Sequence, residues 1–260
     1  MEETTYKIDY EAVRAVVRDR YPIWIATYSE IESRARQLQH NHLIRVDGLR
    51  PLLIMALFAR TVSNTSAAMF VAEHGYEVQS KTLLRTALES MFALAAIAKD
   101  PSMAEAFAQA GEREAKRKVF KSRLWSPELR SPLESRFNSE TFKKAEDIAK
   151  TTKARNTSTE EMAKAAGLHD WYLTAYTVFS DAVHGNIHDL EQQFVRGKDD
   201  EIEGVRSGAI VDNLHGLYLC ASETLLKGLE VMDDVFQIDT GEFRVRMMER
   251  LVYAVGQHSH

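Results

Sequence analysis

The chain has 260 residues, 27% of them charged, and a net charge of −5, which suits one large folded domain and disfavours general binding of polyanions. Its 12 glycines and 5 prolines are too few for a sandwich or barrel with many tight turns. The single cysteine, Cys220, excludes an intrachain disulfide and a cysteine-based zinc site, and its apolar neighbours predict a buried thiol.

Hydrophobic periodicity predicts a series of helices with short breaks between them. In chain order, we expect them at about 8–20, 22–45, 51–73, 76–98, 102–123, 140–152, 159–166, 168–184, 207–235 and 241–255. No segment shows the two-residue alternation of a strand, and 196–208 is expected to be a charged loop. The sequence therefore predicts an all-α bundle of eight to ten helices whose core is formed by the helices near 51–73, 76–98, 168–184 and 207–235.

We expect a single helical domain over 1–260, with a polar and basic elaboration at about 112–166. Within it, residues 112–155 contain thirteen Lys or Arg and seven Asp or Glu, a local charge of +6. This stretch either binds the phosphates of a nucleic acid or forms a solvated helix face. Its densest part is Arg113, Lys116, Arg117, Lys118, Lys121 and Arg123.

Two short motifs carry most of the chemical information. Arg85 and Glu89 are the only charged residues between Thr82 and Ala98, and Ser180 precedes His184 by the same four residues. Residues four apart share one face of a helix, and charges in so apolar a helix persist only when they are paired. The two motifs are therefore either a functional site or a polar network that fixes helix packing.

These motifs also carry a resemblance. His74-Gly-Tyr-Glu77 followed by Leu84-Arg-Thr-Ala-Leu-Glu89, and later Tyr176-x3-Ser180-x3-His184-Gly185, resemble the two signatures of an all-helical bacterial family catalogued only as a domain of unknown function. The resemblance covers roughly 50–195. It implies a helical fold and brings no established activity.

Some helical families of this general kind are similar to the HEPN ribonucleases of toxin and antiphage systems. Those enzymes dimerise and cut RNA without metal, using an Arg and a His four to six residues apart on one helix. No such spacing occurs near 85 or 184, and the matches at Arg34/His40 and Arg36/His42 are no more than chance gives. An HEPN-like site in this chain has to combine Arg85 and His184 from different helices.

The HEPN-like hypothesis is that of a metal-independent RNA-cleaving or RNA-binding protein in bacterial defence or stress, and for cleavage it gives each residue a role. His184 is the base, because its unperturbed pKa lies near neutrality, and Arg85 stabilises the charge on the phosphorane. Glu89 orients Arg85, while Tyr176 and Ser180 hold substrate or fix the imidazole tautomer. The basic residues near 113–123 then face the RNA phosphates.

Two alternatives stay open. In the first, the motifs are structural, and the protein is a non-catalytic helical protein that binds a protein partner or a small ligand. In the second, His184 and His188, four residues apart, are ligands of a metal-dependent hydrolase, although Gly185-Asn186 interrupts the helix between them. The chain has no dinucleotide-binding or phosphate-loop glycine motif and no Gly-x-Ser-x-Gly, so we expect no cofactor.

The location and the partners are also predicted from sequence. The acidic N-terminus has no apolar core of a signal peptide, and no uninterrupted apolar run approaches the about 18 residues of a membrane span. We therefore expect a cytoplasmic protein without membrane association. RNA, a protein partner and a second copy of the chain are the expected partners, the homodimer being closed by the helix at 241–255.

Overall fold

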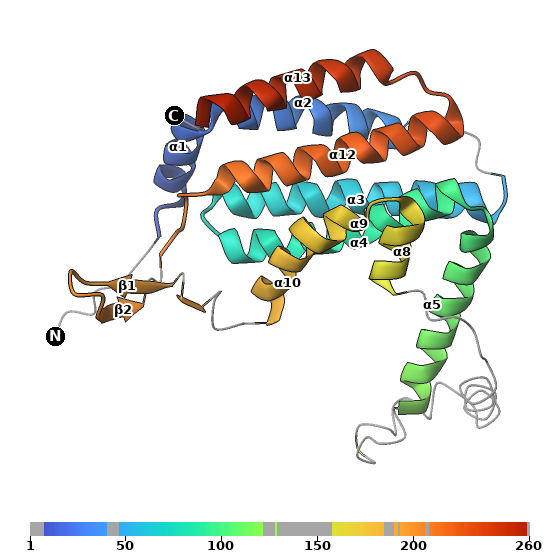
Figure 1. The fold of residues 1–260 in the computed structure, drawn as a ribbon, viewed down its shortest axis with the longest axis horizontal. Helices are drawn as coiled ribbons and strands as arrows, with labels where there is room; N and C mark the ends of the chain where they lie inside the picture. The colour runs from blue at the N-terminus through green and yellow to red at the C-terminus, as the bar shows by residue number, and fades with distance from the viewer. Residues whose placement is uncertain are drawn as a thin grey trace.

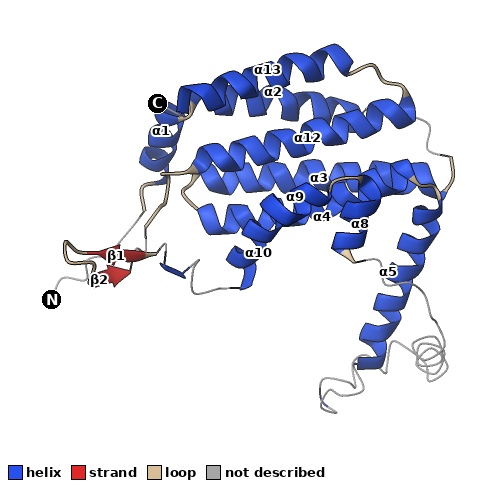
Figure 2. Ribbon diagram, in the orientation of Figure 1, coloured by secondary structure: helices blue, strands red, loops and turns tan. Residues whose placement is uncertain are grey.

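The computed structural model describes residues 8–40, 47–121, 128, 158–184, 190–191, 193–205 and 208–258. For residues 112–113, 115–121 and 184 it describes the backbone alone. Within these residues the chain forms a bundle of long helices, with a small two-stranded sheet to one side (Figures 1 and 2).

The first two helices, α1 (Tyr10–Arg20) and α2 (Pro22–Gln39), are joined by one residue. The Asp9 side chain accepts a hydrogen bond of 3.1 Å from the backbone N–H of Ala12 and so caps α1. Pro22 begins α2, where its missing N–H costs no hydrogen bond. The predicted break at this proline is confirmed.

Helices α3 (Leu49–Glu73) and α4 (Glu77–Lys99) form an antiparallel pair joined at Gly75. Gly75 has a φ of +81°, in the left-handed region that favours glycine. Its carbonyl accepts a hydrogen bond of 2.9 Å from the N–H of Ile210, so the turn also anchors a segment far along the chain. The predicted end of α3 at residue 73 is confirmed.

The centre of the bundle is α4. It packs against α3, α8, α10 and α12, and nearly every residue from Ala87 to Ile97 is buried (Figure 1). The helix ends at Lys99, because Asp100 precedes a proline and adopts an extended conformation. An apolar helix surrounded on several sides is the expected environment for the sequence Thr82 to Ala98.

Two helices flank this centre. In Figure 1, α5 (Ser102–Lys121) leaves the bundle from the end of α4 and projects away from it. Helix α8 (Thr159–Ala166) begins with a capping box between Ser158 and Glu161 and packs against α4. The predicted helix at 140–152 lies outside the described residues. The single domain with an elaboration at 112–166 therefore stays a prediction.

The segment predicted as one helix at 168–184 is continuous but not uniform. It consists of α9 (His169–Trp171), a π-helical turn η2 (Tyr172–Tyr176) and α10 (Thr177–His184). The prediction of a regular helix was wrong over η2. A π turn holds one more residue than an α turn and is often found at functional sites.

The prediction of no strand was also wrong. Strands β1 (Phe194–Arg196) and β2 (Ile202–Val205) pair antiparallel, and Arg196 is ion-paired with Asp200 at 3.0 Å between them (Figure 2). Strands of three and four residues are too short to show a two-residue alternation above background.

The last two helices are α12 (Leu214–Phe236) and α13 (Gly241–His258). Helix α12 begins later than the predicted residue 207. The Asp233 carboxylate accepts backbone N–H bonds of 2.7 and 3.1 Å from Asp239 and Thr240 and so fixes the turn between the helices. The face of α13 away from the bundle is apolar and exposed, and the homodimer predicted through this helix stays a prediction. Its exposed apolar residues are Val245, Met248, Val252, Tyr253 and Val255.

With α9, η2 and α10 counted as one continuous helix, the described residues form nine helices. The prediction of an all-α fold of eight to ten helices is confirmed.

One described helix, α3, is long and apolar enough by length and composition to cross a membrane. It contacts α2, α4 and α12, and core helices of globular proteins pass the same test. The finding is weak evidence for a membrane span, and the cytoplasmic location stays a prediction.

Cys220 on α12 is buried, as predicted, and burial raises the pKa of its thiol from 9.0 to about 12. Because the thiolate is the reactive form, we expect a disulfide reagent at pH 8 to modify the folded protein at least 100-fold more slowly than the urea-unfolded chain. The thiol also contributes to stability below pH 9, and this contribution is lost toward pH 12, because the unfolded chain ionises first. Equal rates of modification in the folded protein and the urea-unfolded chain would contradict the burial of Cys220.

Candidate functional site

Arg85 and Glu89 lie on the face of α4 that contacts α10. They are one helical turn apart, and Arg85 Nη2 lies 3.2 Å from Glu89 Oε1. Their side chains are 23% and 34% exposed, so solvent reaches both. The pair therefore belongs to a half-buried interface and not to a sealed core.

Arg85 joins α4 to the helix that follows the π turn. Its Nε donates to Ser180 Oγ at 3.0 Å, and its Nη2 donates to Tyr176 Oη at 2.9 Å. The Ser180 hydroxyl donates in turn to the backbone carbonyl of Tyr176 at 2.8 Å. The two predicted motifs, about 90 residues apart in sequence, thus converge on one guanidinium group.

Tyr176 closes the cluster. Its hydroxyl donates to Glu89 Oε1 at 2.9 Å, and its ring stacks on Tyr172 with centroids 4.9 Å apart. Burial and then the neighbouring Glu89 carboxylate raise the pKa of the Tyr176 phenol. Tyr176 therefore stays a hydrogen-bond donor at neutral pH and is not suited to act as a base.

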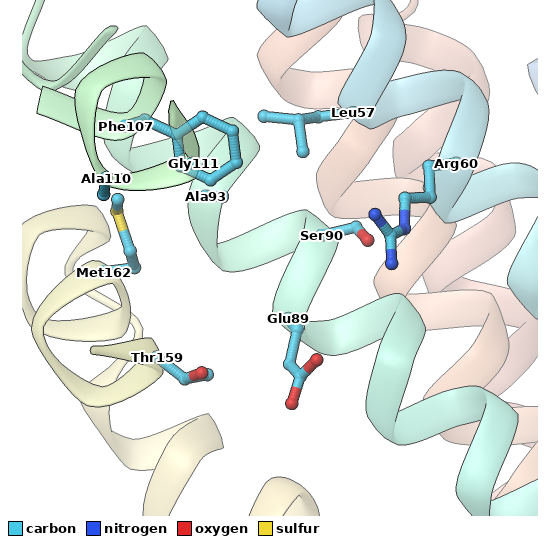
Figure 3. Close-up of a pocket in the computed structure, with 10 residues that line it drawn as sticks. All are labelled: Leu57, Arg60, Glu89, Ser90, Ala93, Phe107, Ala110, Gly111, Thr159 and Met162. Carbon is cyan, nitrogen blue, oxygen red and sulfur yellow. The ribbon is translucent and has the colours of Figure 1, made fainter. Parts of the chain in front are cut away.

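A cavity of about 250 Å³ adjoins the cluster through Glu89 (Figure 3). Four helices, α3, α4, α5 and α8, contribute its walls. Its lining residues are Leu57, Arg60, Glu89, Ser90, Ala93, Phe107, Ala110, Gly111, Thr159 and Met162. The half-buried cluster therefore opens onto a space that a small group can enter.

The structure brings together four of the five residues predicted as catalytic: Arg85, Glu89, Tyr176 and Ser180. The fifth, His184, is the last residue of α10, one turn beyond Ser180, and the structure describes its backbone alone. The role of each residue stays a prediction, because a structural network makes the same contacts.

Most of the predicted phosphate-binding residues lie on the projecting end of α5, where the backbone alone is described. These are Arg113, Lys116, Arg117, Lys118 and Lys121. Arg123 and the predicted metal ligand His188 lie outside the described residues. No group of three His, Cys, Asp or Glu in the described part of the chain could hold a metal ion. The metal-site hypothesis for His184 and His188 stays untested.

Apart from Glu89, the sequence analysis did not find the residues that line the cavity. Arg60 had a usable signal, since it is the one charged residue between Pro51 and Ala72, as Arg85 and Glu89 are in α4. Phe107 and Thr159 had none, because neither interrupts a pattern. Their place in the cavity follows only from how α5 and α8 pack on α4.

The profile of DUF5677, a family of unknown function, matches residues 52–202, more than half of the chain. The chain belongs to this family. The DUF5677 match confirms the predicted resemblance and contains every residue of the cluster and of the cavity. Comparisons with curated proteins and with solved structures found no match. The similarity to HEPN ribonucleases therefore has no support from relatives, and the case for it depends on the site.

Proposed function

We propose that this DUF5677 protein cleaves RNA without a metal ion, with Arg85 and His184 as the catalytic residues. One observation carries the proposal: Arg85 of α4 donates a hydrogen bond to Ser180, which lies one turn before His184 on α10. The packing of α10 on α4 supports a site that combines an Arg and a His from different helices, as an HEPN-like site in this sequence would have to do.

In this reaction His184 takes the proton of the ribose 2′-hydroxyl, and O2′ attacks the adjacent phosphorus. The bond to the 5′-oxygen breaks, and that oxygen takes a proton from water, which leaves a 2′,3′-cyclic phosphate and a 5′-hydroxyl end. Arg85 offers its guanidinium to the phosphorane charge, while Glu89 and Tyr176 hold it in place. The basic end of α5 would bind flanking phosphates.

A specific observation favours a second candidate, a non-catalytic helical protein that binds a partner protein or a small ligand. The charge of Arg85 is matched by Glu89, and its hydrogen bonds go to Ser180 and Tyr176. A cluster of this kind can have a purely structural role, in which it holds α10 on α4. The two candidates differ in the effect of removing the His184 imidazole, which abolishes cleavage only if the protein is a ribonuclease.

The test is cleavage of end-labelled RNA by the purified protein, with and without EDTA, for the wild type, His184→Ala and His169→Ala. We expect cleavage that survives EDTA, falls by roughly 10²–10⁴-fold in His184→Ala, and is retained in His169→Ala. His169 is the control, because it makes no hydrogen bond to the cluster: its Nε2 lies 3.2 Å from Glu160 Oε1, and its ring stacks on Tyr172.

Cleavage that EDTA abolishes would replace the proposal with the metal site at His184 and His188. No cleavage by the wild type would favour the non-catalytic protein. Equal loss in both histidine variants would also contradict a catalytic His184.

A further inference from the structure

The cavity beside Glu89 has an apolar part and a polar part. In Figure 3, Leu57 and Phe107 lie at one end and Glu89 and Thr159 at the other, with Arg60 and Ser90 to one side. Phe107 gives it an aromatic ring, and Met162 a flexible thioether that adapts to a flat surface. The occupant therefore has an apolar or aromatic body and a polar edge.

The volume limits the size of this occupant. At about 250 Å³, the cavity is smaller than the roughly 300–1,000 Å³ of pockets for drug-sized ligands. It is too small for a peptide helix. It suits one planar ring system that enters from outside.

The polar groups define the occupant's edge. Both contacts of the Glu89 carboxylate within the cluster use Oε1, and Oε2 accepts no hydrogen bond from the described residues. Since a carboxylate only accepts, a ligand that displaces water from Oε2 has to offer it an N–H or O–H donor. A purely apolar ligand at this position would leave Oε2 without a donor, and an acid would repel it.

Arg60 defines the rest of the ligand. Its side chain is exposed at the edge of the cavity and has no hydrogen-bond or ion-pair partner among the described residues. A guanidinium of this kind binds a phosphate through two parallel hydrogen bonds. The ligand then combines an aromatic ring, an N–H edge and a phosphate outside the cavity.

We propose that this cavity binds a nucleobase with an exocyclic amino group, whose amino N–H donates to Glu89 and whose phosphate contacts Arg60. Phe107 packs against the base, as aromatic side chains do when proteins take single bases out of a stack. Cytosine and adenine fit this chemistry, and uracil, which has no amino group, fits it poorly. Where the bound base belongs to an RNA, the inference rests on the proposed function, because that RNA is then the substrate.

The base has two sources, a single-stranded RNA or a free mononucleotide. Both are tested by calorimetric titration of the full chain carrying His184→Ala, which keeps RNA intact. The probes are heptamers of C, A and U and the monophosphates CMP, AMP and UMP. We expect the C and A heptamers to bind about tenfold more tightly than the U heptamer. Monophosphates that bind as tightly as the heptamers would make the free nucleotide the ligand.

Gly111→Leu tests the cavity without removing a contact. A Cβ at Gly111 meets no atom within 4 Å, so the leucine extends into open space at the cavity wall, and loss of a helical glycine favours α5. Gly216→Leu is the matched control, since Gly216 is also an exposed helical glycine with no atom within 4 Å of its Cβ, on α12. We expect at least tenfold weaker binding in Gly111→Leu and unchanged binding in Gly216→Leu.

Two further variants test the polar groups. Glu89→Gln is expected to reduce the preference for C over U, because the amide is a weaker acceptor than the carboxylate. Arg60→Ala is expected to weaken CMP binding and leave cytidine binding unchanged. The inference is overturned if C, A and U bind equally, if no probe binds, or if Gly111→Leu binds as tightly as Gly216→Leu.

These outcomes are separable from those of the cleavage assay. Base-selective binding without cleavage by the wild type would overturn the proposed function and still support the cavity as a nucleobase site. Cleavage that depends on His184 would support the proposed function. If binding were then equal for C, A and U and unchanged in Gly111→Leu, the inference about the cavity would be overturned.

Discussion

Gly75→Ala is expected to lower the free energy of unfolding by about 3 kcal/mol, as the sum of a strained backbone and a steric clash. At a φ of +81°, an alanine costs roughly 1–2 kcal/mol more than glycine. The new Cβ would also lie 2.3 Å from Ala209 Cβ and 2.8 Å from Ala209 Cα, so backbone has to move. The shift would weaken the hydrogen bond from Ile210 to Gly75.

Urea unfolding of Gly75→Ala and Gly167→Ala separates the two terms. Gly167 also ends a helix in the left-handed region, with a φ of +75°, but a Cβ there meets only Lys99 Nζ, the end of a flexible side chain, so its replacement adds mainly backbone strain, about 1 kcal/mol. Equal losses in the two variants would show that the close approach of Ala209 contributes nothing.

Arg85→Met is expected to have an effect of similar size, a loss of about 2–4 kcal/mol of stability together with loss of the proposed RNA cleavage. Methionine keeps the length of the side chain but removes the bonds to Ser180 and Tyr176 and the ion pair with Glu89. The Glu89 charge is then left without its cation. Because both side chains are partly exposed, the loss falls below that of a fully buried pair.

A double-mutant cycle with Glu89→Gln checks this reading. The double variant should be destabilised by less than the sum of the two single variants, since neither charge is then left alone. Arg246→Met is the control: Arg246 is an exposed arginine paired with Glu30 at 3.3 Å, and its loss should cost less than about 1 kcal/mol. Additive single effects would mean that Arg85 and Glu89 do not interact.

The helices were predictable from the sequence because their apolar residues repeat at helical spacing and their ends carry local signals. Pro22, Gly75 and the Ser158–Glu161 capping box are such signals. The cluster was predictable because charges in an apolar helix need partners, and the structure supplies them from η2 and α10.

The rest depends on tertiary packing. The cavity is formed by residues 57–60, 89–93, 107–111 and 159–162, and no single stretch of sequence shows that these meet. The hairpin at 194–205 is too short for its pattern to stand out. The backbone alone is described for His184, the fifth residue predicted as catalytic, and the cleavage assay with His184→Ala tests its role.

The π turn at 172–176 has a consequence for how the chain is read and redesigned. Each residue of an α-helix advances about 100° around the axis, so one surplus residue in a turn changes the phase of everything that follows. A pattern extended backward from Tyr176 at α-helical spacing therefore selects the wrong residues before Tyr172. A chain shortened by one residue within this turn would rotate Ser180 by about 100° relative to Leu168 and swing its hydroxyl away from the guanidinium on α4.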